Sequence, residues 1–336
     1  MLTLEQCIMP KQAELFDLLL TIYKDKADYL QGGYILVPGD APIMLIAHLD
    51  TVHKEAVKHI CKTEDGRIIM SPEGIGGDDR CGVYALNTIY ERAEVKPWLL
   101  FTCDEEVGGI GALDFTKDYN RELLPKELAG LKMLVEIDRR GDNDAVYYDC
   151  DNVEFEDYIT SKGFETDWGS FSDISTIAPV LGVAAVNLSS GYYNAHTQYE
   201  YIDSNHLDAT IERVLEIVED CTHPDFPAYK YIKAKRTYSY GGAYYGKDYS
   251  LNKYGWKSGW YDYCYEDEED EYLADVPESI RNEYDALLDY HSEEELNDIL
   301  DEFGEHYIEL LFESEFGGTY EEIFGVADEE DATESK

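Results

Sequence analysis

Apolar residues in the first two-thirds of the chain fall into two kinds of pattern. Short continuous apolar runs bounded by turn residues are typical of buried strands, and apolar residues recurring every three or four positions are typical of helices that cover a core. The runs predict strands at 34–37, 43–47, 98–101, 131–137 and 182–187, with a further strand at 146–148. The recurring pattern predicts helices at 4–23, 79–92, 111–119, 153–162 and 206–220.

This alternation of strands and helices determines the predicted architecture. It favours a three-layer α/β/α sandwich, in which helices cover both faces of a mixed, mostly parallel sheet. Ligands of such sheets bind in loops beyond the carboxyl ends of the strands. His48, Glu105 and Asp138 each follow a predicted strand closely. We therefore expect their side chains to meet at one edge of the sheet.

The pattern changes after Pro227, and we assign residues 1–225 to the α/β domain. Residues 226–275 are rich in Tyr, Gly and Lys and then acidic, and we interpret them as a linker or a packed arm. A small acidic helical appendage is predicted over 276–326, and a disordered acidic tail over 327–336. The apolar faces of its two helices would carry Ile280, Tyr284, Leu287 and Leu288 in the first, and Leu296, Ile299, Leu300, Phe303, Tyr307, Leu310 and Leu311 in the second.

The formal net charge of −45 is unusually negative for a chain of 336 residues, and most of it lies in residues 261–336. Such a chain repels nucleic-acid phosphates and anionic membrane surfaces, and it tolerates cations. Lysines among the tyrosines of the arm are typical of segments that stack on nucleic-acid bases, but the adjoining acidic block opposes that interpretation. The composition thus predicts no nucleic-acid partner and no membrane partner.

Cysteine usage and the N-terminal sequence bear on the cellular compartment. The seven cysteines are scattered, odd in number and without CxxC spacing, which argues against a disulfide framework. Residues 1–12 lack a basic segment followed by an apolar one. No apolar run approaches the ~18 residues that a membrane span needs. We therefore expect a soluble cytoplasmic protein.

Histidine and acidic residues recur in the loops that follow the predicted strands. They are His48 and Asp50 in AHLDTVH, Asp78 in GIGGDDRCG, Glu105 and Glu106 in FTCDEEVGG, Asp138 in EIDRRGD, and His196 in NAHTQYE. Zn²⁺ accepts imidazole nitrogens and carboxylate oxygens, and two neighbouring ions need a carboxylate that bridges them. Two histidines and three carboxylates suit two divalent cations, with Zn²⁺ preferred and Co²⁺ or Mn²⁺ also compatible. One glutamate then remains free to act as a general base.

The order HLDT, GGDDRCG, DEEVGGIGA, ID and AHT resembles that of the co-catalytic dizinc exopeptidases. This superfamily contains aminopeptidases, dipeptidases and zinc carboxypeptidases with a phosphorylase/hydrolase-like α/β fold, and the resemblance extends over residues 4–220. It implies five metal ligands, namely His48, Asp78, Glu106, Asp138 and His196. It also implies that Asp78 bridges the ions, that Asp50 lies behind His48 and that Glu105 is the general base. A cis peptide bond between Asp78 and Asp79 is implied as well.

The spacing of these motifs departs from two branches of the superfamily. Carboxypeptidases and dipeptidases carry a lid domain between the last aspartate and the last histidine, but Asp138 and His196 are too close in sequence for one. The large oligomeric aminopeptidases insert a β-domain between HxD and DD, and the gap from Asp50 to Asp78 is too short for it. A compact core similar to simple aminopeptidases remains. The Ser-Asp pair ending at Asp173 resembles a motif near the family's site, and Asp173 is a candidate for binding the substrate amine.

These observations predict a metal-dependent hydrolase that removes N-terminal residues from peptides. The substrate would be a peptide or amino-acyl compound with a free N-terminus. Two alternatives on the same core are a dipeptidase and an N-acyl amino-acid deacylase, and a third is a binding or adaptor protein without turnover. The acidic appendage leaves a protein partner open, and an oligomer is compatible with the sequence. We interpret the other histidines, His53 among them, as surface or packing residues.

Overall fold

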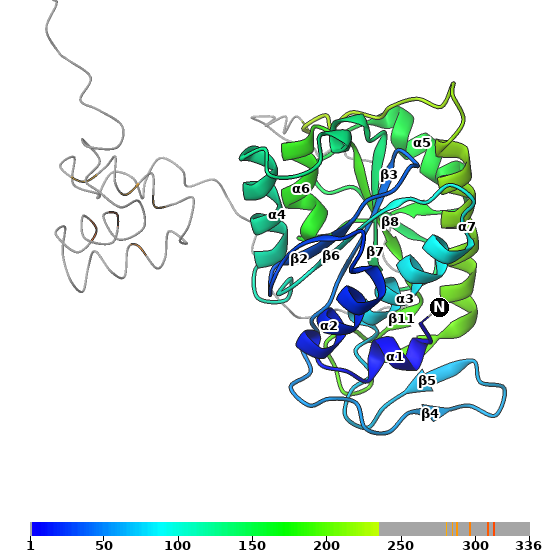
Figure 1. Ribbon diagram of the computed structural model, residues 1–336. Helices are drawn as coiled ribbons and strands as arrows, with labels where there is room; N and C mark the ends of the chain where they lie inside the picture. Colours follow the sequence, from blue (N-terminus) through cyan, green and yellow to red (C-terminus); the bar gives the residue numbers. More distant parts are fainter. Residues whose placement is uncertain are drawn as a thin grey trace, which may run out of the picture. The chain divides into compact units, whose positions relative to one another are not determined.

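The computed structural model describes residues 2–234 and six separate residues further on. The chain divides into two units, Met1–Gly241 and Gly242–Lys336. Helices and an open sheet make up the first unit (Figure 1). Of the second unit the structure describes Ile280, Tyr284, Leu287, Leu296, Ile308 and Phe312, all of which are buried and all but Ile280 α-helical. Most of the predictions for 226–336 therefore lie outside the described residues.

An eight-stranded sheet forms the centre of the first unit. Its strand order is β1-β2-β6-β3-β7-β10-β8-β9. The strands are β1 (Asp28–Leu30), β2 (Tyr34–Val37), β3 (Ile43–His48), β6 (Trp98–Thr102), β7 (Met133–Arg139), β8 (Asp144–Val146), β9 (Glu165–Thr166) and β10 (Ala185–Ser189). The central strands β6, β3, β7 and β10 are parallel. β1 pairs antiparallel with β2, β2 with β6, and β8 with β10, whereas β8 and β9 are parallel. The predicted mixed, mostly parallel sheet is confirmed.

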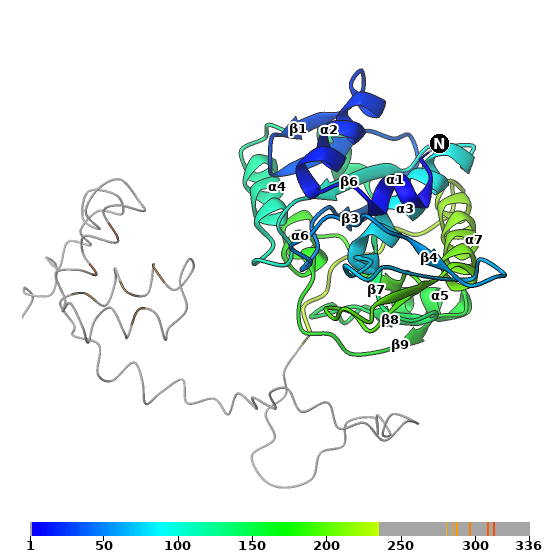
Figure 2. The ribbon, with the colours of Figure 1, turned by 90° about the horizontal axis from the view of Figure 1, so that it is seen from below.

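Helices cover both faces of this sheet (Figures 1 and 2). One face carries α2 (Gln12–Tyr23), α3 (Gly77–Arg92), α5 (Val153–Ser161) and α7 (Ser204–Cys221), and the other carries α4 (Ile110–Asn120) and α6 (Asp173–Leu181). Alternate residues of β3 serve the two cores: Leu45 packs in the first, and Met44 and Ile46 pack in the second. Continuous apolar runs are needed because these strands are buried on both faces. The predicted three-layer sandwich is confirmed.

The strand register brings the segments that follow β3, β6 and β7 to the same edge of the sheet. His48 at the end of β3 pairs with Thr102 of β6, and Ile46 pairs with Glu136 of β7. Since these strands are parallel, the segments that follow them leave the sheet on the same side. The residues after β6 and the end of β7 therefore lie beside His48.

A second, smaller sheet was not predicted. It is antiparallel, in the order β11-β12-β5-β4, with strands β4 (Cys61–Lys62), β5 (Ile68–Met70), β11 (Tyr192–Tyr193) and β12 (Tyr201–Asp203). Strands of two or three residues are too short to show a periodic pattern. The sheet joins the segment between Asp50 and Asp78 to the segment around His196, so it helps to bring these loops together.

The predicted helix over 4–23 is wrong in one respect, because the structure contains two helices there. These are α1 (Leu4–Ile8) and α2, separated by a turn that contains Pro10. Proline has no N–H group to continue the helix, and Lys11 after it has an extended backbone. Helix α6 was also missed, and a short 3₁₀ helix, η1 (Lys126–Gly130), precedes β7.

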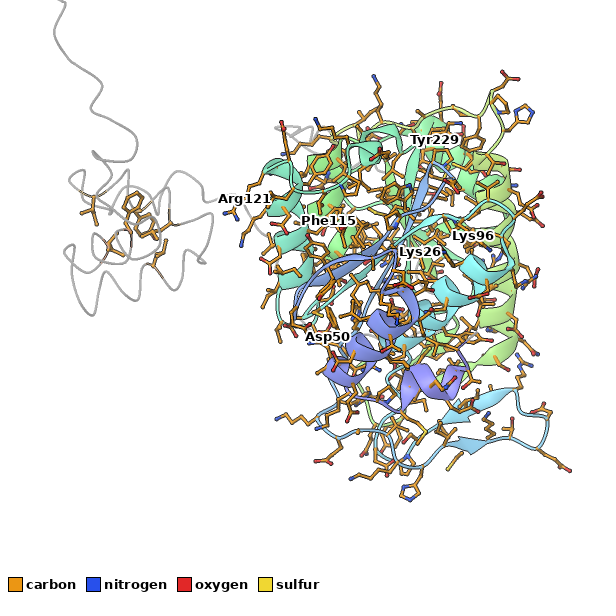
Figure 3. All side chains as sticks on the ribbon, viewed as in Figure 1. Lys26, Asp50, Lys96, Phe115, Arg121 and Tyr229 are labelled. Carbon is orange, nitrogen blue, oxygen red and sulfur yellow. The ribbon has the colours of Figure 1, made fainter. Side chains whose placement is uncertain are left out.

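Residues 226–234 belong to the first unit and hydrogen-bond to the rest of it. The backbone N–H of Tyr229 donates to the carbonyl of Lys132, and that of Ala184 donates to the carbonyl of Tyr229. Tyr229 and Asp50 lie toward opposite ends of this unit (Figure 3). This segment therefore borders the end of the sheet remote from the candidate site. In the part of the chain that the structure describes, no helix is long and apolar enough to cross a bilayer.

Candidate metal centre

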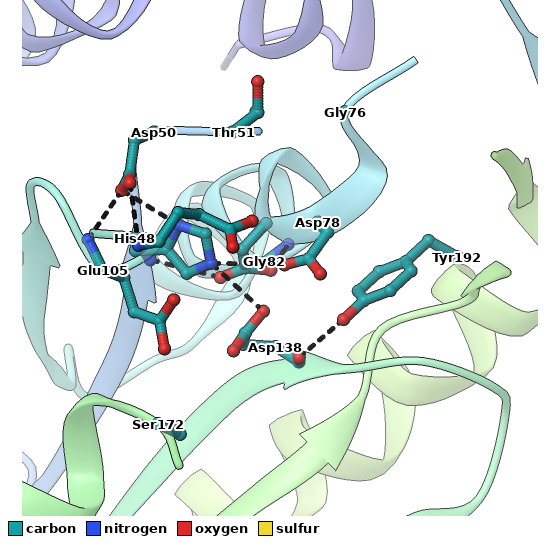
Figure 4. Close-up of polar contacts among 12 residues, drawn as sticks. His48, Asp50, Thr51, Gly76, Asp78, Gly82, Glu105, Asp138, Ser172 and Tyr192 are labelled. Carbon is teal, nitrogen blue, oxygen red and sulfur yellow. Dashed lines mark hydrogen bonds and ion pairs between the residues drawn. The ribbon is translucent and has the colours of Figure 1, made fainter. Parts of the chain in front are cut away.

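His48, the last residue of β3, is buried at the carboxyl edge of the sheet (Figure 4). Its Nδ1 lies 3.2 Å from Oδ1 of Asp50. Asp50 also accepts hydrogen bonds of 3.0 Å from the backbone N–H groups of Glu105 and Glu106. A carboxylate at Nδ1 fixes the imidazole tautomer that leaves Nε2 available to a metal. Asp50 therefore orients His48 and also fastens the loop that carries the two glutamates.

Asp78 lies at the start of α3, where its backbone is not helical and its peptide bond to Asp79 is cis, as the resemblance implies. Its two carboxylate oxygens face different histidines. Oδ1 is 3.2 Å from Nε2 of His48, and Oδ2 is 3.2 Å from Nε2 of His196. A carboxylate between two imidazoles is an arrangement suited to bridging two cations.

Two further carboxylates join this cluster. Oδ1 of Asp138 is 3.4 Å from Nε2 of His48, and Oε2 of Glu106 is 3.1 Å from Nε2 of His196. Single ligand atoms of His48, Asp78 and Glu106 also lie within 4.8 Å of one another, so these three could hold one ion. The structure thus brings all five sequence-predicted ligands together. Their binding of metal stays a prediction.

The charges and unpaired atoms of the cluster fit divalent cations. Oε1 of Glu106 is buried without a hydrogen-bond partner, and Oδ1 of Asp138 is buried with Nε2 of His48 3.4 Å away. Hydrogen bonds with Asp78 and Glu106 raise the pKa of His196 to about 10. Burial lowers the pKa of His48, but Asp138 and the other nearby carboxylates outweigh it and raise this pKa well above its ordinary value. The carboxylates around the two imidazoles therefore favour positive charge at this site.

Glu105 lies beside the cluster and is not needed as a ligand. Figure 4 shows its side chain near those of His48 and Asp138. Burial is the main cause that raises its pKa to about 7, and Asp173 and Glu106 add to the effect. A carboxyl group with a pKa near neutrality can both accept and donate a proton. The role of Glu105 as a general base stays a prediction.

Asp79 and Gly82 hold the start of α3 against the sheet. The Asp79 carboxylate is buried and accepts hydrogen bonds from the backbone N–H groups of His48, at 3.3 Å, and Gly82, at 2.9 Å. A Cβ at Gly82 would lie 2.3 Å from the carbonyl oxygen of Ile137 and 2.5 Å from the Asp79 carboxylate. Only glycine permits this close approach of α3 to β7. The contacts fix the backbone next to Asp78.

Asn187 of β10 positions Asp138, and sequence reasoning missed it. Its Oδ1 accepts the backbone N–H of Asp138 at 2.9 Å, and its Nδ2 donates to Oδ2 of the same residue at 3.4 Å and to the Tyr148 hydroxyl at 3.2 Å. The Ser172 hydroxyl donates to the buried carboxylate of Glu136 in the same network. The one available signal was a polar residue within the apolar run AAVNL.

Asp173 begins α6 and is buried close to Glu105, as the resemblance implies for the Ser-Asp pair. The Thr102 hydroxyl donates to its Oδ2, and its Oδ1 has no hydrogen-bond partner. Burial raises its pKa to about 6. Of the two predicted roles for His53, surface or packing, the structure shows packing, because the side chain is largely buried and its Nε2 lies 2.8 Å from Oε2 of Glu200.

Comparison with known proteins places this fold among solved peptidase structures. No protein-family model and no curated protein matches the sequence. Aminopeptidase PepT from Bacillus cereus is 15% identical with a TM-score of 0.50, and the match covers 66% of this chain and 97% of that chain. This likeness shows the fold, which is the α/β fold that the motif resemblance implies.

Two further solved structures are similar at lower TM-scores. A tripeptidase from Staphylococcus aureus is 17% identical with a TM-score of 0.48, over 65% of this chain and 96% of that chain. A TET aminopeptidase from a marine sediment archaeon of the Thaumarchaeota is 12% identical with a TM-score of 0.49, over 65% of this chain and 98% of that chain.

Proposed function

We propose that this protein is a metal-dependent exopeptidase that removes N-terminal residues from peptides by means of two divalent cations, with Zn²⁺ preferred. The observation that carries the proposal is the position of Asp78, whose two oxygens face His48 and His196. Asp138 and Glu106 add one carboxylate beside each histidine. The fold shared with a solved aminopeptidase supports the same class of reaction.

In this proposal the five clustered side chains hold the cations. Glu105 transfers protons, and Asp50 orients the His48 ligand. Two bound cations would supply an activated water and polarise the scissile carbonyl. Glu105 accepts a proton from the attacking water and later donates it to the leaving amine. Asp50 keeps the His48 imidazole in its ligating orientation. Asn187 does the same for the carboxylate of Asp138.

Asp173 is our candidate for the group that binds the free N-terminus of the substrate. Its buried Oδ1 has no hydrogen-bond partner. This oxygen would lie only 3.4 Å from a Cβ built at Gly109, in the loop that follows Glu106. An ammonium group is the natural partner of an unpaired buried carboxylate. This position would select substrates whose amine is free.

The test combines metal analysis with a matched pair of substrates. The purified protein is measured for bound metal, and amino-acyl anilides are compared with their N-acetylated counterparts. We expect two metals per chain and cleavage that requires the free amine. Equal rates on the N-acetylated series would favour the deacylase alternative. Cleavage of dipeptides alone would favour a dipeptidase, and metal binding without turnover on any of these would favour the binding-protein alternative.

A further inference from the structure

Glu200 is a buried carboxylate outside the five clustered ligands. It belongs to the NAHTQYE segment that also carries His196, and its side chain is 1% exposed. Its Oε1 accepts the backbone N–H of Asp78 at 3.0 Å, and its Oε2 accepts that of Gly76 at 3.0 Å. The His53 imidazole lies 2.8 Å from Oε2. One side chain therefore joins the loop of His196 to the loop that presents Asp78.

The glycine-rich loop before α3 is shaped around these contacts. A Cβ at Gly77 would lie 2.6 Å from the Cβ of Tyr192 and 3.4 Å from Oε1 of Glu200. Gly74 has a φ of +90°, and a Cβ there would lie 2.4 Å from the His53 ring. Larger residues would push the loop away from both partners. The glycines thus allow backbone N–H groups to reach a buried carboxylate.

The energetics of this contact favour a fixed loop. A buried carboxylate is costly unless it is hydrogen-bonded, and hydrogen bonds to a charged acceptor are the stronger kind. Removing the carboxylate would leave the N–H groups of Gly76 and Asp78 without this acceptor inside the protein. The backbone of Asp78 would then lose the anchor that places its two oxygens opposite His48 and His196.

We propose that Glu200, braced by His53, is the positioning residue that fixes Asp78 as the shared carboxylate of the two cation sites. The role given to Asp78 rests on the function proposed above. Glu200 contacts neither cation nor substrate in this account, and it acts through residues 74–78. The small second sheet supports the arrangement, since β12 begins directly after Glu200 and pairs with β5 ahead of the loop.

The first test measures the loop itself, without metal and without turnover. Amide hydrogen exchange of peptides covering residues 74–80 is compared between the metal-free wild type, Glu200→Gln and Glu200→Ala. Asp203→Asn is the matched control, because Asp203 is also a buried carboxylate of this region but pairs with Arg67. We expect exchange about tenfold faster in both Glu200 variants and unchanged exchange in the control.

The second test measures Zn²⁺ affinity by competition with a chelator in the same proteins. We expect about 10–100-fold weaker binding in Glu200→Gln, and wild-type affinity in Asp203→Asn. His53→Ala should also speed exchange and weaken Zn²⁺ binding, by a smaller factor. If the Glu200 variants do not fold, this variant tests the inference in their place. Wild-type exchange and affinity in Glu200→Gln, or an equal loss in the control, would overturn the inference. If the wild type binds no metal, the proposed function is overturned instead. The hydrogen-exchange data would still show whether Glu200 anchors the loop.

Discussion

Both histidines of the cluster have pKa values above the ordinary histidine value, and the proposed function assigns both as metal ligands. The pKa of His196 is raised to about 10 by hydrogen bonds with Asp78 and Glu106. Below that pH its imidazole is protonated, so a cation must displace the proton to bind. Carboxylates that stabilise a protonated histidine in the absence of metal are the same groups that would stabilise a bound cation. Metal binding and protonation therefore compete at this site.

Metal affinity should consequently fall as the pH is lowered. Each displaced proton weakens binding by about tenfold per pH unit below the pKa of the histidine concerned. Isothermal titration of Zn²⁺ into the metal-free protein at pH 8, 7 and 6, in buffers of different ionisation enthalpy, measures both affinity and proton release. An affinity that is constant over this range, with no protons released, would contradict the assignment of His196 as a ligand.

Replacement of Glu105 should separate metal binding from turnover. Glu105→Gln keeps the size of the side chain and removes its ability to accept a proton. We expect the variant to bind two metals like the wild type and to lose about 10²–10⁴-fold in kcat. Turnover near that of the wild type, with the metals bound, would remove Glu105 from the mechanism.

The residues that sequence could predict differ physically from those it could not. His48, Glu106 and Asp138 lie in motifs that directly follow strong apolar runs, so both their chemistry and their place at the sheet edge can be predicted locally. Asn187 and Glu200 act on backbone groups far away in the chain. Nothing in the local pattern indicates those partners, so only the folded structure shows their roles.

At the scale of elements, burial on both faces made the central strands predictable. β3 and β6 are apolar up to their last residues, His48 and Thr102, because alternate residues pack in two different cores. The small sheet lacks such a signal, since its strands have two or three residues. Prediction also failed at Pro10, where the apolar spacing continues but the backbone cannot stay helical.

The close approach of α3 to β7 yields a prediction about Gly82. Gly82→Ala should lower the free energy of unfolding by about 1–3 kcal/mol, since the new Cβ would meet the carbonyl of Ile137 and the Asp79 carboxylate. Gly130→Ala is the control, because a Cβ there has no neighbour within 4 Å. Urea unfolding of both variants measures the difference. Equal stability of the two would show that α3 can shift at no cost.

Arg80 ties the turn between α1 and α2 to α3. It is buried, and its Nη1 donates to the carbonyls of Cys7, at 2.6 Å, and Pro10, at 2.9 Å. Arg80→Met would leave both carbonyls without this donor, and we expect a loss of about 2–4 kcal/mol in unfolding free energy. Arg92→Met, on the same helix, removes an exposed pair with Glu212 and should cost less than about 1 kcal/mol. Thermal and urea unfolding would contradict this account if the two losses were equal.

At the scale of the whole molecule, the α/β sandwich and most of the negative charge belong to different parts of the sequence. The first unit contains the sandwich and every residue of the candidate site, whereas residues 261–336 carry most of the net charge of −45. The sequence predicts both the α/β part and the acidic part, because each has its own composition. The predicted boundary lies at 225, whereas residues up to 234 hydrogen-bond to the rest of the first unit. Backbone hydrogen bonds of this kind cannot be predicted from the amino-acid composition of the segment.

The central claim is that one aspartate is shared by two cations. A crystal structure of the Zn²⁺-loaded protein, with anomalous data at the zinc edge, tests it most directly. We predict two peaks about 3.5–4 Å apart, one on each side of the Asp78 carboxylate, with His48 and His196 bound to different ions. A single peak, or two peaks that do not share Asp78, would contradict the account.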